Sequence, residues 1–128
     1  MAGSSRSPYT VGRSEIVTAR SSATASGTVA TLATPTGGTR ARIVYLSAIF
    51  DNATAASFEV YFGTGANITT NAGKEIANFF MDLTDNPSER LVFPQDSGPI
   101  GATDDVISIR SSGSAGTFGI IVGFTEMT

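Results

Sequence analysis

The chain has 128 residues, contains neither cysteine nor histidine, and carries a net charge of −3. This length fits one domain that can bury about two-thirds of the surface exposed by its unfolded chain. The missing residue types exclude disulfides, thiolate metal sites, cysteine nucleophiles and every Ser/His catalytic pair.

The charge is divided unevenly along the chain. Residues 1–42 contain five arginines and one acid, a net charge of +4, whereas residues 43–128 have a net charge of −7. This asymmetry predicts that a basic arm or strand meets an acidic surface, for example that of another copy of the protein. The alternative is that these five arginines are surface side chains surrounded by water and contact no partner. The basic residues are not clustered with aromatics, so no nucleic-acid partner is expected.

The first residues have the composition of an extended arm. Residues 1–13 are rich in Gly, Ser, Pro and Arg and show no hydrophobic periodicity. We assign residues 14–128 to a single domain. Fixing an arm costs about 1–2 kcal/mol for each backbone residue, so an ordered arm needs a partner. Arg6, Arg13 and Arg20 are therefore predicted to contact neighbouring chains.

The sequence lacks the features of a membrane or secreted protein. No apolar run reaches the roughly 18 residues needed to span a bilayer. The N-terminal stretch has an arginine but no apolar block after it, unlike a secretory signal. We expect synthesis in a cytoplasm and no membrane partner.

Two short strands precede the strongest one. Residues 14–20 (SEIVTAR) and 27–34 (GTVATLAT) are predicted strands separated by a small-residue stretch. Residues 35–38 (PTGG) form a predicted turn that leads into a strong strand over 41–50.

Residues 39–63 contain two strong strands joined by small residues, which predicts a hairpin. In its second strand an apolar row alternates with a more polar row. The apolar row is Phe58, Val60 and Phe62, and the more polar row is Ser57, Glu59 and Tyr61. In the first strand both rows are apolar, namely Val44, Leu46, Ala48 and Phe50 against Ile43, Tyr45 and Ile49.

A strand that is apolar on both faces needs cover on both sides. The second sheet of a sandwich supplies one cover, and a chain segment or a neighbouring subunit supplies the other. The predicted oligomer interface consists of outward-facing residues: Ile43, Tyr45, Ile49 and Tyr61.

The second half of the chain continues the strand pattern. The predicted elements, in order, are a loop at 63–71, a strand or single helical turn at 75–82, a short strand at 90–93, a long irregular crossing, and a final strand pair at 105–110 and 117–126. About eight strands spaced about ten residues apart predict an all-β antiparallel sandwich. The long crossings favour jelly-roll or Greek-key topology over a meander.

The order of several segments resembles small virion proteins of tailed bacteriophages. These segments are RARIVYLSAIF, FEVYFGTG, RLVFPQDSGPIGATDD and VISIRSSGSAGTFGIIVGFTE, and the resemblance covers residues 27–126. In that group a β-sandwich decorates or cements the capsid, or serves in a head or tail fibre. Its fold is similar to trimeric jelly rolls of the tumour necrosis factor type. The resemblance implies no catalytic residue.

Acidic and aromatic residues give only weak hints of chemistry. Asp82 with Asp85, and Asp104 with Asp105, offer oxygen ligands for Ca²⁺, but the twelve-residue calcium-loop pattern is missing, so carboxylates that bind their own turn are favoured. Glu59 and Glu75 are also considered as an acid and a base for sugar hydrolysis, a reaction that needs two carboxylates at a fixed separation. Tyr45, Tyr61 and Phe79 form either an aromatic binding platform or, as we favour, part of an interface.

The sequence therefore predicts a non-enzymatic protein without a cofactor that acts by binding. The main hypothesis is a capsid decoration or cement protein on the phage surface, a homotrimer that contacts the major capsid protein or other virion proteins. The alternatives are a tail or fibre module that binds a receptor or carbohydrate and, from another class, a glycan-active enzyme.

Overall fold

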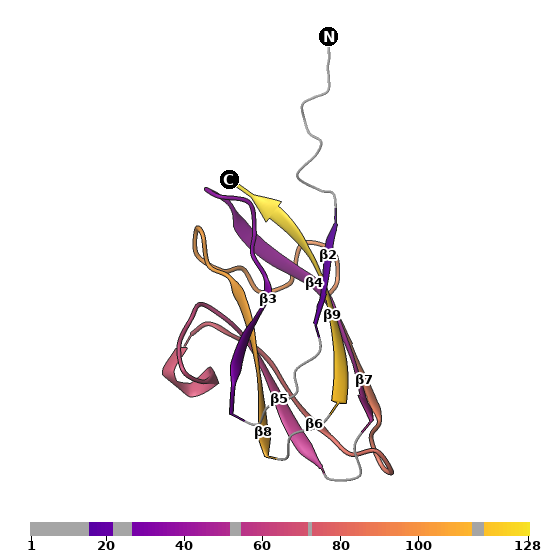
Figure 1. Cartoon of the computed structure of the whole chain (residues 1–128). Helices are drawn as coiled ribbons and strands as arrows, with labels where there is room; N and C mark the ends of the chain where they lie inside the picture. Colours follow the sequence, from indigo (N-terminus) through magenta and orange to yellow (C-terminus); the bar gives the residue numbers. More distant parts are fainter. Residues whose placement is uncertain (1–15, 22–26, 52–54, 72, 114–116) are drawn as a thin grey trace.

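The structure, a computed structural model, describes residues 16–21, 27–51, 55–71, 73–113 and 117–128. Within them, eight strands form two four-stranded sheets that face each other (Figure 1). The elements are β2 (Val17–Ser21), β3 (Val29–Ala33), β4 (Arg40–Asp51), β5 (Ala56–Phe62), the 3₁₀ helix η3 (Ile68–Asn71), β6 (Glu75–Met81), β7 (Ser88–Val92), β8 (Ile107–Gly113) and β9 (Thr117–Met127). In these ranges no helix has the length and apolar character needed to cross a bilayer.

The predicted all-β antiparallel sandwich is confirmed. The strand orders are β2-β9-β4-β7 and β3-β8-β5-β6, and every pair is antiparallel. The first strand pairs with the last, β3 with β8, β4 with β7, and β5 with β6. Among the described strands, this nested pairing is of the kind expected for jelly-roll topology and not for a simple meander. The segment 75–82, for which the sequence allowed a strand or a single helical turn, forms the strand β6.

The predicted hairpin over residues 39–63 is wrong. β4 pairs with β7 and β9, whereas β5 lies in the other sheet and pairs with β6 and β8. The final pair, β8 and β9, is likewise divided between the sheets. Phe50 and Phe58 meet edge to face across the core, with ring centroids 5.3 Å apart. Two strands with strong apolar rows gain more burial by facing each other across a core than by lying side by side.

A β-bulge changes the predicted faces of β4. Ile43 is paired with Phe124 and Tyr45 with Gly123, so Val44 is an extra residue. Ile43 is consequently 1% exposed and lies in the core, not on the outer face as the alternation predicted. The inward row then resumes with Leu46 and continues through Ala48 and Phe50.

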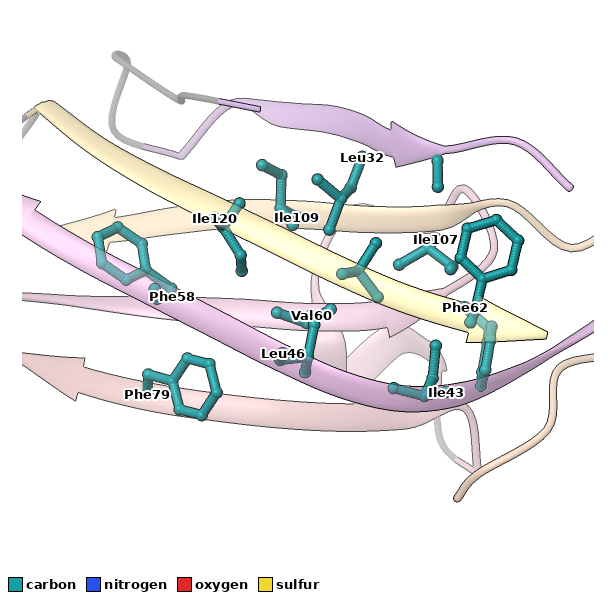
Figure 2. Packing of buried hydrophobic residues seen from close by; sticks show 14 of the residues in the cluster. Leu32, Ile43, Leu46, Phe58, Val60, Phe62, Phe79, Ile107, Ile109 and Ile120 are labelled. Atoms are coloured by element: carbon teal, nitrogen blue, oxygen red, sulfur yellow. The ribbon is translucent and has the colours of Figure 1, made fainter. Parts of the chain in front are cut away.

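The core fills the space between the sheets. Figure 2 shows Leu32, Phe58, Val60, Ile107 and Ile109 from one sheet facing Ile43, Leu46 and Ile120 from the other. The inward positions Ile120, Val122 and Phe124 of β9 are buried. Each such side chain contributes about 1.5–3 kcal/mol of burial free energy, which is the main stabilising term of the sandwich.

The long crossing after β7 runs against the start of β4. Ile43 N donates to Pro99 O at 3.0 Å, and Gly101 N donates to Ala41 O at 3.0 Å. A Cβ on Gly98 would lie 1.8 Å from the Ile43 carbonyl oxygen, so only glycine allows this approach. The crossing is therefore held firmly to the sandwich.

Candidate interaction surface

The outer side of the β2-β9-β4-β7 sheet carries two of the three most exposed large apolar residues among those described, Ile49 and Val92; the third, Phe80, lies on β6 at the edge of the other sheet. The register places Thr18, Gly123, Tyr45 and Val92 in one row across the sheet. The next row holds Arg20, Ile121, Ser47 and Arg90. Ile49 follows, paired with Gly119 and Ser88. We call this surface the open face; it consists of Thr18, Arg20, Tyr45, Ser47, Ile49, Arg90, Val92 and Ile121.

Two large aliphatic side chains on the open face point into solvent. Ile49 is 62% exposed and Val92 is 61% exposed. They lie on neighbouring strands, with Ile49 paired to Ser88 and Tyr45 paired to Val92. The Ser47–Arg90 pair lies between them, so the two exposed apolar side chains stand at opposite ends of the open face, with Tyr45 beside Val92.

Tyr45 is placed on the open face by a glycine. A Cβ on Gly123 would lie 2.1 Å from Cε1 of Tyr45, so the ring lies directly over the glycine backbone. The Tyr45 and Thr18 hydroxyls are 3.4 Å apart. This packing flattens the ring onto the sheet and leaves it half-buried.

The open face also carries cations that have no acidic partner in the described part of the chain. The three salt bridges found there join Arg42 to Asp96, Lys74 to Asp105, and Arg110 to Glu59. Arg20 and Arg90 are exposed and take part in none of them. The open face thus combines apolar and cationic groups.

On the outer side of the other sheet, the charged and phenolic groups of the middle strands have partners within the chain, while Phe80 on the edge strand β6 is 71% exposed. Glu59 lies 3.3 Å from Arg110 and accepts a bond from Ile68 N at 3.0 Å, which fastens η3 to β5. Tyr61 is fully buried and donates to Gly65 O at 2.9 Å. Burial raises the pKa of Tyr61; the Glu59 carboxylate raises this pKa further, and Arg110 opposes both.

The predicted interface residues therefore separate into two groups. Tyr45 and Ile49 lie together on the open face. Ile43 is in the core, and Tyr61 is buried on the opposite side of the sandwich, so neither is available at this surface. Arg20 lies on the open face, while Arg6 and Arg13 fall outside the described residues.

The sequence interpretation missed Arg90 and Val92. Their signal was the alternation within β7, where Ser88, Arg90 and Val92 are exposed and Glu89 and Leu91 are half-buried. Strict alternation over five residues is typical of a strand with one solvent-facing side.

The candidate acidic sites bind their own backbone. Asp82 Oδ1 accepts from Thr84 N at 2.8 Å and from Asp85 N at 3.3 Å. Asp104 accepts from Gly38 N at 2.7 Å. Asp105 is paired with Lys74 at 3.1 Å. No group of three or more acidic residues suited to a metal ion is found in the ranges that the structure describes.

The other predicted constellations are not assembled. Tyr45, Tyr61 and Phe79 do not form a platform, because Tyr45 is on the open face, Tyr61 is on the far side and Phe79 is in the core. Glu59 is engaged by Arg110, while Glu75 accepts from Gly73 N at 2.9 Å.

Comparisons with known proteins identify a shared fold. No protein-family model matches the chain, and no curated protein matches it in sequence. A chain of the acidic stable capsid structure of Helicobacter pylori bacteriophage KHP30 is similar in three dimensions. Its TM-score is 0.59 at 12% sequence identity, over 89% of this chain and 89% of that chain. At this identity, the likeness establishes the fold alone.

Proposed function

We propose that this protein is a non-enzymatic virion structural protein, a decoration or cement protein that self-associates as a homotrimer and stabilises a phage capsid. The observation that carries the proposal is the open face, where Ile49 and Val92 are mostly exposed and where Arg20 and Arg90 form no salt bridge with any described residue. The similarity in fold to a chain of a phage capsid structure supports the same role.

The open face provides the physical means of self-association. Covering apolar surface stabilises an interface by about 25 cal/mol for each Å² removed from water. Arginines next to it provide orientation and speed of encounter rather than most of the affinity. Tyrosine is enriched at interfaces because it buries a large ring while its hydroxyl stays hydrogen-bonded, as Tyr45 does with Thr18.

The N-terminal arm supplies a second kind of contact. Arg6 and Arg13 are proposed to reach acidic surfaces of neighbouring chains, the major capsid protein or other virion proteins among them. Several weak contacts made by one oligomer add to a strong attachment, because each one raises the effective concentration for the next.

The test is a charge placed in the apolar part of the open face. Ile49→Asp is expected to shift the protein to monomer in light scattering and to remove it from purified particles. The matched control is Thr31→Asp, an exposed position on β3 in the other sheet. Unchanged association and unchanged occupancy for Ile49→Asp would contradict the proposed role of the open face.

The arm is tested separately. Deletion of residues 1–13 is expected to lower particle occupancy while the isolated protein keeps its melting temperature. Full occupancy after the deletion would count against a role of the arm in attachment.

A further inference from the structure

A groove lies at the end of the open face, beside the first described residue. It has a volume of about 560 Å³, within the range of 300–1,000 Å³ that is usual for ligand sites. Its walls include Ile16, Arg42, Val44, Phe93, Asp96 and Met127. We call it the rim groove.

The rim groove contains a polar group that needs a partner. Arg42 Nε is buried and has no hydrogen-bond partner among the residues that the structure describes, while Nη1 of the same side chain is 3.2 Å from Asp96 Oδ1. A buried donor without an acceptor is costly, and a carboxylate is the acceptor that suits a guanidinium best. The Asp96 side chain is 74% exposed, so its carboxylate remains accessible to a second cation.

The groove is formed in advance. Phe93 N donates to Val44 O at 2.9 Å, and Ser97 N donates to Pro94 O at 3.0 Å. Asp96 itself has a φ of 59°, in the left-handed region that few residues other than glycine adopt. A rigid site of this kind binds an extended segment with less ordering cost on its own side.

The chemistry of the walls matches one segment of this chain. Residues 11–15 read VGRSE, and in an extended backbone Val11, Arg13 and Glu15 project from the same side. An apolar side chain would meet Val44 and Phe93, a cation would meet Asp96, and a carboxylate would meet Arg42. Glu15 is the sole acid before residue 51.

The position of the arm favours a groove in another molecule. If β2 were extended in its register, Glu15 would lie opposite Glu126, and like charges in that arrangement are unfavourable. Fifteen extended residues span up to about 50 Å. Because Ile16 already lines the groove of its own chain, the residues before it are more than long enough for that groove and can reach the groove of a neighbour. We propose that the rim groove binds residues 11–15 of a neighbouring copy; this rests on the self-association proposed above.

Cross-linking of the full chain tests the proposal, because the sequence has no native cysteine. Gly12→Cys combined with Gln95→Cys, at the groove wall, is expected to give disulfide-linked multimers on non-reducing gels. Gly12→Cys with Thr31→Cys, on the other sheet, is the control and should stay unlinked. An intramolecular disulfide alone, or no disulfide, would overturn the assignment.

Light scattering of the same reduced variants separates the two proposals. An oligomer without cross-links overturns the groove assignment and leaves self-association standing. A monomer overturns both.

A double-mutant cycle provides a second readout. Glu15→Gln and Arg42→Lys are each expected to weaken association about tenfold, since a hydrogen bond between charged groups is lost. If the two side chains meet, the double variant should be no weaker than either single variant. Arg40→Lys, a neighbouring cation outside the groove, is the control. Fully additive losses, or no loss, would contradict contact between Glu15 and Arg42.

Discussion

The outer sides of the two sheets differ in how far their side chains are covered and paired within the chain. On the β3-β8-β5-β6 sheet, the segment that contains η3 binds back onto the strands through Glu59, and Tyr61 is buried beneath it. On the β2-β9-β4-β7 sheet, Ile49 and Val92 remain mostly exposed, and Arg90 has no acidic partner in the described ranges.

The difference predicts which side is more available to a partner molecule. We call the outer side of the β3-β8-β5-β6 sheet the covered side; its Glu59, Arg110 and Tyr61 have partners inside the chain, and its strongly exposed apolar side chain is Phe80 on the edge strand β6. The open face has exposed apolar side chains and arginines that form no salt bridge within the described ranges, the kinds of group that a partner can cover or pair. Comparing substitutions on the two sides therefore separates stability from association.

The largest expected effect distinguishes two isoleucines on β4. Ile43→Ala should lower the free energy of unfolding by about 2–5 kcal/mol, because it leaves a cavity between the sheets. Ile49→Ala should change it by about 0.5 kcal/mol or less in dilute protein, because that side chain is already in water. Urea-induced unfolding measures both. Equal losses would mean that Ile49 is buried within the single chain.

The next effect concerns the covered side. Glu59→Gln should lower the free energy of unfolding by about 1–3 kcal/mol, since it removes the charge opposite Arg110 in a setting that is 12% exposed at the glutamate. Asp85→Asn, at an exposed turn, is the matched control and should have almost no effect. A similar cost for both variants would show that the Glu59 contacts contribute little.

A smaller effect is expected where Tyr45 lies over Gly123. Gly123→Ala should cost about 1 kcal/mol, the lower end for overpacking, because the ring at the surface can rotate away. In a Tyr45→Ala background the same substitution should be neutral. Gly119→Ala is the control, because its Cβ would lie 3.5 Å from Ile49 Cγ1, an ordinary contact. Persistence of the cost without the ring would contradict this packing.

The smallest effect is a pH dependence on the covered side. The pKa of Tyr61 is raised in the folded chain, so the folded state holds the phenol proton more tightly than the unfolded state does. Its contribution is complete below pH about 10, the ordinary value for tyrosine, and is lost as pH rises beyond it. Tyr61→Phe should flatten part of the fall in melting temperature between about pH 9 and 11. Tyr45→Phe should not, and equal slopes for both variants would refute the assignment.

Part of the interaction surface could be predicted from the sequence. The two-sided apolar character of residues 43–50 indicated a strand that needs two covers, and Tyr45 and Ile49 do lie on the outer side. Ile43 was assigned to the wrong face because a period of two cannot reveal an inserted residue such as Val44. Tyr61 was misassigned because the loop directly after its strand folds back and accepts its hydroxyl hydrogen bond at Gly65, which the alternation of a strand does not record.

The sequence by itself determined the approximate positions of the strands and the all-β class, because side-chain period and turn residues act over a few neighbouring positions. The tertiary structure alone decided that β4 and β5 belong to different sheets, that β9 lies between β2 and β4, and that Arg20 and Arg90 share one row. Any two strands can form the same backbone hydrogen bonds. The choice among partners is therefore made by long-range packing, such as the contact of Phe50 with Phe58 across the core.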